Sequence, residues 1–220
     1  MSPAQWANSW LDVPWLGENA GTIGGYLVQH IELTVLAVAI GLVLSIPAGF
    51  LAWRTPALRG LLLGIAGVLY TIPSLALFAL LVPFTGLTTV TAEIGLVAYT
   101  LLVLMRNVVV GLEGVSPAVR DAATGMGYRP LRRLLQVELP LALPVIMAGV
   151  RIATVTTIGL VTVTAVIGEG GLGAMILLGL DNEFKTEIWI GGAICVVLAV
   201  LGDLGLASVQ RALTPWSRST

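Results

Sequence analysis

Long apolar stretches separated by short polar segments run through most of the chain. Five of them hold few or no charged side chains, and each is close to the roughly 20 residues that a helix needs to cross a bilayer. They span residues 31–53, 58–82, 94–110, 141–167 and 188–209. The pattern therefore predicts an all-α, polytopic membrane protein with five transmembrane helices.

Arginines concentrate in the segments that follow the first, third and fifth predicted spans. They are Arg54, Arg59, Arg120, Arg129, Arg132, Arg133, Arg211 and Arg218. The other segments carry mainly acidic residues, namely Asp12, Glu18, Glu93, Glu169, Asp181, Glu183 and Glu187, with Lys185 as their one basic residue. Because basic loops stay in the cytoplasm, we expect the N-terminus outside and the C-terminus inside.

Composition agrees with a membrane protein and excludes other classes. Hydrophobic residues make up 57% of the chain and charged residues 10%, which is far from the balance of a soluble globular domain. A net charge of −1 disfavours nucleic-acid binding, which needs a clustered basic surface. Cys195 is the only cysteine, so neither an intramolecular disulfide nor a cysteine-based zinc site is expected.

The chain is organised as one membrane domain with short ends. Residues 1–25 contain Trp6, Trp10 and Trp15 but no lysine or arginine, which favours a retained extracytoplasmic segment at the membrane surface over a cleaved signal peptide. We expect the transmembrane domain at 26–212 and a short cytoplasmic tail at 213–220.

Prolines and glycines mark special positions inside the spans. Pro47, Pro73 and Pro144 each remove a backbone donor, and we expect each to bend its helix. Gly60 and Gly64 form a small-xxx-small pair that allows close packing of a neighbouring helix.

The predicted cytoplasmic loop between the third and fourth spans is too long for a simple connection. The order Ser116, Pro117, Gly125, Gly127 and Pro130 predicts a helix that is capped, ended by glycine and followed by a second helix. Two interpretations stay open: a compact docking element for a soluble partner, approached closely at Ala122 and Ala123, or an amphipathic hairpin at the membrane interface.

The residues of this loop, 116–140, carry a family resemblance. Asp121-Ala122-Ala123, Gly127, Val137 and Leu139-Pro140 fall at the spacing E-A-A, three residues, G, nine residues, an aliphatic, one residue, L-P. This resembles the loop signature of binding-protein-dependent ABC importer permeases with a MetI-like transmembrane domain. The resemblance implies that the stretch from Asp121 to Pro140, which contains these seven residues, is the coupling helix that inserts into a groove of the ATPase subunit. Asp121 stands where the family usually has glutamate.

Two further stretches are similar to the osmoprotectant branch of that family. They are residues 70–77, with the sequence YTIPSLAL, and residues 168–173, with the sequence GEGGLG. The resemblance implies a permease that carries glycine betaine, choline or carnitine across the bacterial cytoplasmic membrane. Alternatives are a permease for another small, amino acid-like solute and an ion-coupled secondary transporter.

The energy source is expected on another chain. No G-x-x-x-x-G-K-[ST] loop is present, so a separate ATPase subunit would bind ATP and Mg²⁺, and this chain is expected to be neither an enzyme nor a metal or cofactor binder. The implied partners are that ATPase, an extracytoplasmic substrate-binding protein, a second permease copy or paralogue, and membrane lipid.

Three residues are candidates for the solute path. Ser74 beside Pro73 and Glu169 among glycines are expected along the route. Arg106 and Arg151 are expected to snorkel toward the membrane surface. His30, the only histidine, is expected to be structural, which leaves no constellation for an intramembrane enzyme.

Overall fold

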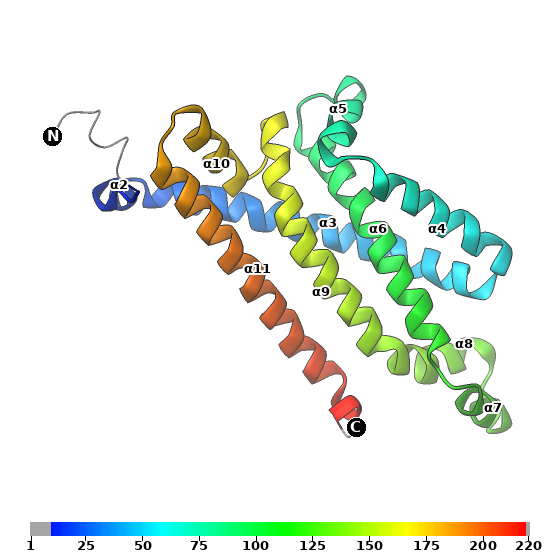
Figure 1. Ribbon diagram of the computed structural model, residues 1–220. Helices are drawn as coiled ribbons and strands as arrows, with labels where there is room; N and C mark the ends of the chain where they lie inside the picture. Colours follow the sequence, from blue (N-terminus) through cyan, green and yellow to red (C-terminus); the bar gives the residue numbers. More distant parts are fainter. Residues whose placement is uncertain (1–9, 219–220) are drawn as a thin grey trace. The chain divides into compact units, whose positions relative to one another are not determined.

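The computed structural model describes residues 10–218, and in that range every regular element is a helix (Figure 1). The α-helices are α2 (Val13–Glu18), α3 (Ala20–Arg54), α4 (Pro56–Thr71), α5 (Ser74–Thr85), α6 (Thr89–Glu113), α7 (Pro117–Gly125), α8 (Pro130–Arg133), α9 (Leu139–Val163), α10 (Leu172–Asp181) and α11 (Lys185–Leu213). The π-helix η1 (Leu134–Glu138) and the 3₁₀-helices η2 (Thr164–Ile167) and η3 (Pro215–Arg218) complete the order. Trp6, predicted at the interface, and the last two residues of the predicted tail lie outside the described range.

Four of the five predicted spans are continuous helices long and apolar enough to cross a membrane. They are α3, α6, the run Pro130–Ile167 that joins α8, η1, α9 and η2, and α11. The helices α3, α6 and α11 extend beyond both ends of the predicted apolar stretches, whereas the Pro130–Ile167 run extends only at its N-terminal end. The short helix α10 was not predicted.

The second predicted span is not one straight helix. It consists of α4 and α5, which are bent by 99° at the break between Thr71 and Ser74. A residue that precedes proline avoids the helical region, and proline itself donates no backbone hydrogen bond. Pro73 accordingly has φ −55° and ψ 135° and becomes the N-cap of α5. Pro47 and Pro144, by contrast, lie inside helices that continue through them.

The helices form two compact units, and the first comprises residues 10–38, Ile72–Val97 and Thr154–Gly202. At its N-terminal end the side chain of Asp12 caps α2, and its backbone N–H donates to Thr186 Oγ1 at 2.9 Å. Trp10 packs on Trp189 with ring centroids 5.8 Å apart. The placement of this segment at the membrane interface stays a prediction.

His30 lies in the interior of this first unit, as expected of a structural histidine. Its side chain is buried, and its Nε2 lies 3.0 Å from the carbonyl oxygen of Ile158. Gly171 approaches so closely that a Cβ there would lie 2.7 Å from the backbone nitrogen of His30. The close contact between Gly171 and His30 therefore holds the glycine-rich loop, residues 168–173, against α3.

The second unit comprises Ala39–Thr71, Ala98–Ala153 and residues 203–218. Its core contains Val108, Leu112, Ala142 and Ile146. Glycines bring the helices together here: a Cβ at Gly49 of α3 would lie 2.8 Å from Val108 Cβ of α6. Small residues permit this approach in membrane helix packing.

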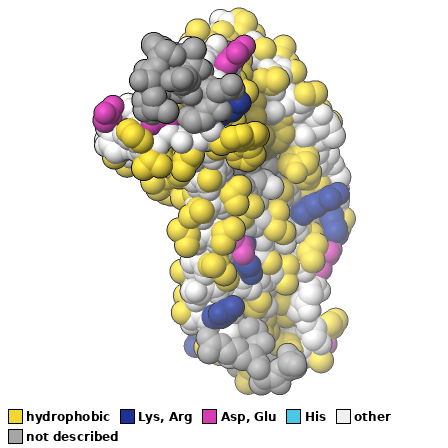
Figure 2. Space-filling model, turned by 60° about the vertical axis from the view of Figure 1, so that its left-hand side comes forward, with side chains coloured by type: hydrophobic (Ala, Val, Ile, Leu, Met, Phe, Trp, Pro, Cys, Tyr) yellow, Lys and Arg dark blue, Asp and Glu magenta, His cyan; other side chains and the backbone are white. Residues whose placement is uncertain are grey.

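Much of the helix surface is apolar. Hydrophobic side chains are spread along the face seen in Figure 2, and large ones such as Val43, Phe84 and Val196 are exposed. Contiguous apolar surface of this kind is typical of helices that face lipid. The direction of the chain across the membrane stays a prediction from the placement of the arginines.

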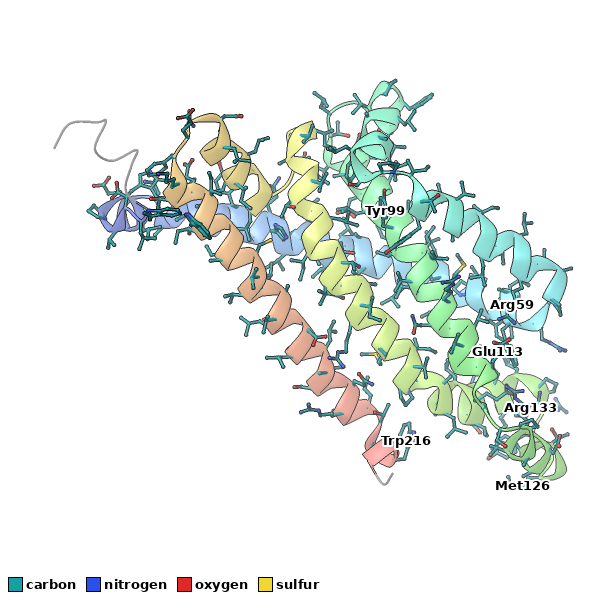
Figure 3. All side chains as sticks on the ribbon, in the orientation of Figure 1. Arg59, Tyr99, Glu113, Met126, Arg133 and Trp216 are labelled. Atoms are coloured by element: carbon teal, nitrogen blue, oxygen red, sulfur yellow. The ribbon has the colours of Figure 1, made fainter. Side chains whose placement is uncertain are left out.

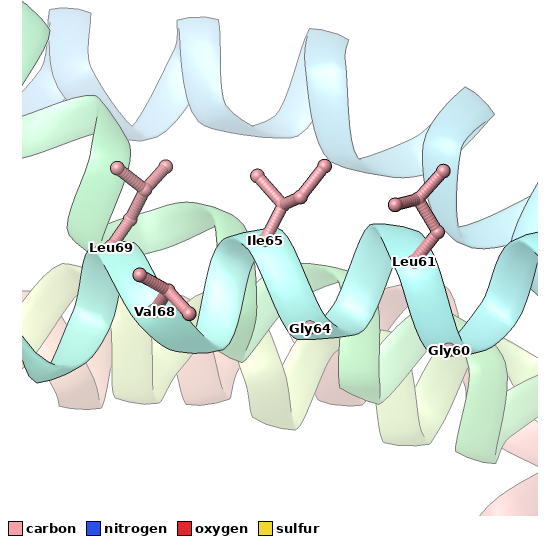
Figure 4. A pocket seen from close by; sticks show the side chains of 6 residues that line it. All are labelled: Gly60, Leu61, Gly64, Ile65, Val68 and Leu69. Carbon is pink, nitrogen blue, oxygen red and sulfur yellow. The ribbon is translucent and has the colours of Figure 1, made fainter.

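The Gly60 and Gly64 pair does not pack against another helix within residues 10–218. Nothing lies within 4 Å of a Cβ placed at either residue. The pair instead lines an open apolar groove on α4 together with Leu61, Ile65, Val68 and Leu69 (Figure 4). Because α4 presents this face outward, close packing of a neighbouring helix at the pair stays a prediction, and such a helix would belong to another chain.

Candidate functional site

The predicted docking loop folds as a helix, a glycine turn and a second helix, in the order that its sequence indicates. Pro117 begins α7, and Ser116 is its N-cap residue, although the Ser116 side chain makes no capping hydrogen bond. Pro130 begins α8. The prediction of a capped first helix is confirmed for its boundaries and wrong for the side-chain cap.

Gly127 closes α7 through its backbone conformation. Its φ is 82°, its N–H donates to the carbonyl of Thr124 at 2.9 Å, and the N–H of Tyr128 donates to the carbonyl of Ala123 at 3.1 Å. These two bonds form a Schellman motif, which needs a left-handed residue and therefore favours glycine. The glycine of the loop signature thus sets the shape of the turn.

The signature residues of α7 divide between surface and interior. Asp121 and Ala122 are exposed, whereas Ala123 is only 1% exposed. Met126, at the end of α7, is 70% exposed and carries an apolar side chain into the surroundings (Figure 3). Sequence reasoning overlooked Met126, although an apolar residue beside a turn glycine was a signal. Asp121, Ala122 and Met126 together form a small exposed surface of mixed polarity.

The remaining signature residues lie where the second helix enters α9. Val137, Leu139 and Pro140 are half-buried. The helix is widened here, since the N–H of Leu139 bonds to the carbonyl of Leu134 and closes a π-turn. Pro140 has no N–H to donate to the preceding turn, so the Leu-Pro pair favours such a distortion just before it.

An ion cluster lies under the loop. Glu138 is 1% exposed, and its Oε1 accepts a hydrogen bond from Nε of Arg133 at 2.7 Å. Nε of Arg120 lies 3.4 Å from its other carboxylate oxygen. Sequence reasoning placed Glu138 at a variable position of the signature and overlooked it, although it is an acidic residue among four arginines of one loop.

A second ion pair lies beside the loop. Arg59, near the start of α4, pairs with Glu113, the last residue of α6 (Figure 3). Both side chains are more than 40% exposed, so this pair contributes little to stability.

The predicted path residues lie in the first unit. Ser74 begins α5, which contacts η2 just before Glu169. Glu169 accepts hydrogen bonds from Gln29 Nε2 at 2.8 Å and from Thr89 Oγ1 at 2.9 Å. The N–H of Gly171 donates to Gln29 Oε1 at 3.1 Å. Both oxygens of Glu169 are thus engaged within the protein, which favours a role in holding the loop.

Arg151, which was expected to snorkel toward the membrane surface, has a partner of opposite charge. Its guanidinium pairs with Asp203 of α11, and its Nη1 lies 3.4 Å from Gln210 Oε1. Gln210 Nε2 in turn donates to the carbonyl of Pro144 at 3.1 Å. A charge within a span is costly, and a partner of opposite sign on the adjacent helix offsets that cost. Within residues 10–218, no cluster of His, Cys, Asp and Glu suits a metal ion.

Comparisons with known proteins agree with this arrangement. Residues 26–219 match the family described as "Binding-protein-dependent transport system inner membrane component". The chain is 38% identical to the choline transport system permease protein OpuBB of Bacillus subtilis, over 92% of this chain and 94% of that protein. It is 37% identical to the carnitine transport permease protein OpuCB of Listeria monocytogenes, over 85% and 86% of the two chains.

A further relative and a solved structure extend the comparison. The osmoprotectant import permease protein OsmW of Salmonella typhimurium is 37% identical, over 90% of this chain and 94% of that protein. The fold is similar to a chain from the inward-facing MetNI methionine ABC transporter, with a TM-score of 0.80 and 23% identity, over 93% of this chain and all of that chain. At this identity the likeness establishes the fold.

Proposed function

We propose that this chain, which belongs to the family of binding-protein-dependent transport system inner membrane components, carries quaternary-amine compatible solutes such as glycine betaine, choline or carnitine. It is a permease component of an ABC importer and a multi-pass protein of the bacterial inner membrane. The proposal of solute rests on the names of its relatives, which cover choline, carnitine and osmoprotectant transport.

The loop from α7 to Pro140 is proposed to dock into the ATPase subunit. The observation that carries this assignment is the Schellman-closed end of α7, which leaves Asp121, Ala122 and Met126 on an exposed surface. A short, rigid helix end of this kind transmits displacement without absorbing it. Ala123, Gly127, Val137, Leu139 and Pro140 would give the loop its shape beneath that surface.

Energy then comes from the partners. ATP and Mg²⁺ would be held by two ATPase subunits, and this chain would supply no catalytic residue. Closure of the ATPase pair around ATP would move the docked loops and rock the spans of two permease copies or paralogues. An extracytoplasmic binding protein would deliver the solute. Pro73, Ser74 and Glu169 are proposed to border its route, with Glu169 holding the glycine-rich loop.

Reconstitution tests the proposal. The full chain, the ATPase that copurifies with it and the binding protein are placed in proteoliposomes, and uptake of labelled choline, glycine betaine and carnitine is measured. We expect uptake that needs both ATP and the binding protein. Uptake driven by an ion gradient without ATP would instead identify a secondary transporter, and competition by amino acids alone would identify another solute.

A paired substitution tests the docking surface. Ala122→Asp places a charge on the exposed face of α7, and we expect it to weaken copurification of the ATPase. Ala57→Asp is the matched control, because Ala57 is also an exposed alanine and lies in the first turn of α4, where an acidic residue is tolerated. Equal copurification by the two variants would contradict docking at α7.

A further inference from the structure

Glu138 is a buried charge at the point where the loop enters the long helix. Its carboxylate lies 2.7 Å from Nε of Arg133 and 3.4 Å from Nε of Arg120, and the residue is 1% exposed. A buried carboxylate is stable only when groups of opposite charge compensate it. Arg133 does so through a hydrogen bond, and Arg120 through an ion pair without a hydrogen bond. The cluster therefore links the beginning of the Pro130–Ile167 run to α7.

Arg120 connects α7 to two further helices. Its Nη2 donates to the carbonyl of Leu112 near the end of α6. Its guanidinium carbon lies 5.4 Å from the ring centroid of Trp53, near the end of α3. One side chain of α7 thus contacts the ends of α3 and α6 and the start of the run to which Glu138 belongs.

Glu138 is the last residue of the π-helix η1. An extra residue in one turn rotates the side chains that follow it by about 100° relative to a regular α-helix. Leu134 and Leu139 close this turn, and Pro140 follows it. The Leu-Pro end of the signature and the buried carboxylate are therefore parts of one local geometry.

We propose that Arg120 and Glu138 form the joint through which the coupling loop moves the spans, as positioning residues that hold α7 rigidly to α3, α6 and the start of the Pro130–Ile167 run. The inference rests on the proposed function, because it assumes that the loop receives motion from an ATPase subunit. It goes beyond docking, because both side chains face the interior of the unit and the joint acts on the transmission of that motion. When the contact between Arg120 and Glu138 is lost, ATP hydrolysis continues, but each hydrolysis event moves the spans less and transports less solute.

The test compares solute uptake with ATP hydrolysis in the reconstituted full complex. The variants are Glu138→Gln, Arg120→Gln, the double variant and Glu113→Gln. Glu113 is the matched control, since it is also a glutamate paired with an arginine, but its side chain is 42% exposed. We expect Glu138→Gln and Arg120→Gln to copurify with the ATPase and to lower uptake per ATP hydrolysed by about tenfold, a typical coupling effect. Glu113→Gln should keep the wild-type ratio.

The double variant separates a joint from two independent effects. If both residues act through one contact, the loss of uptake per ATP in the double variant is no larger than the loss in the more severely affected single variant. A loss equal to the product of the two single losses, or a wild-type ratio in both single variants, overturns the proposal.

Arg120→Lys keeps the test decisive if Glu138→Gln or Arg120→Gln does not assemble. Lysine keeps the charge, but it is a point charge and cannot contact Leu112, Trp53 and Glu138 together as the planar guanidinium does. We expect an assembled complex with reduced uptake per ATP, and a wild-type ratio overturns the joint. Failure of the proposed function gives a different result, since the wild-type chain would then not copurify with any ATPase.

Discussion

Arg151 and Asp203 form a bidentate ion pair, in which Nε and Nη2 of the arginine lie 2.8 and 2.7 Å from the two carboxylate oxygens. The pair joins the middle of α9 to α11 within the second unit. Planar guanidinium and carboxylate groups match each other in this geometry. The pair therefore compensates both charges and also fixes the register of the two helices. In apolar surroundings, either charge without the other would be destabilising.

We therefore predict that Arg151→Gln or Asp203→Asn lowers the thermal stability of the detergent-solubilised protein, because each leaves one charge without its partner. The exchanged pair Arg151→Asp with Asp203→Arg should recover part of the loss. Arg106→Gln is the control, since Arg106 is exposed on α6. The melting temperature followed by tryptophan fluorescence checks this, and equal melting of Arg151→Gln and Arg106→Gln would show that the pair is dispensable.

This pair also shows what sequence reasoning could and could not predict. The boundaries of α7 followed from Pro117, Gly125 and Gly127, because prolines and glycines act on their own backbone. The partner of Arg151 lies 52 residues away and could not follow from local pattern. One signal was present: two residues of opposite charge lie inside spans predicted to be consecutive.

The prolines illustrate the same limit within one residue type. Pro47, Pro73 and Pro144 were all expected to bend their helices, but the break occurs only at Pro73 among the three. A proline removes one hydrogen bond wherever it stands, and packing by the surrounding helices decides whether the helix continues. Such packing cannot be derived from a single sequence.

Gly127 gives a prediction about the loop. Replacement by alanine keeps the size of the turn but forces a side chain into a left-handed conformation, at a cost of about 1 kcal/mol. We expect faster hydrogen exchange over residues 121–128 and weaker ATPase copurification. Gly127→Asn should be tolerated better, because asparagine adopts this conformation more readily.

Gly125→Ala is the control for that change. Gly125 is the last residue of α7 and does not have a positive φ, and nothing lies within 4 Å of a Cβ placed there. Alanine at this position should leave exchange unchanged or slow it, since alanine favours the helix. Equal exchange in Gly127→Ala and Gly125→Ala would mean that the positive φ is not needed for the closed turn.

Glu169 gives a prediction about selectivity. Its oxygens accept hydrogen bonds from Gln29 and Thr89, so Glu169→Gln should loosen the glycine-rich loop for every solute alike. Uptake of choline, a cation, and of glycine betaine, a zwitterion, should fall by the same factor. Asp181→Asn is the control, because Asp181 is an exposed acidic residue at the end of α10. A selective rise in KM for choline would show instead that the charge of Glu169 contacts the solute.

Pro73 provides a test of the break between α4 and α5. Pro73→Ala restores a backbone donor and relieves the restriction on Ile72, so the two helices should join into a straighter one, with a rise of about 1.5 Å per residue. Pulsed EPR between spin labels at the exposed positions Leu61 and Leu80 should then report a longer distance. Pro83→Ala is the matched control, because Pro83 already lies inside α5. An unchanged distance in Pro73→Ala would show that tertiary packing alone imposes the bend, and uptake by that variant should then also remain at the wild-type rate.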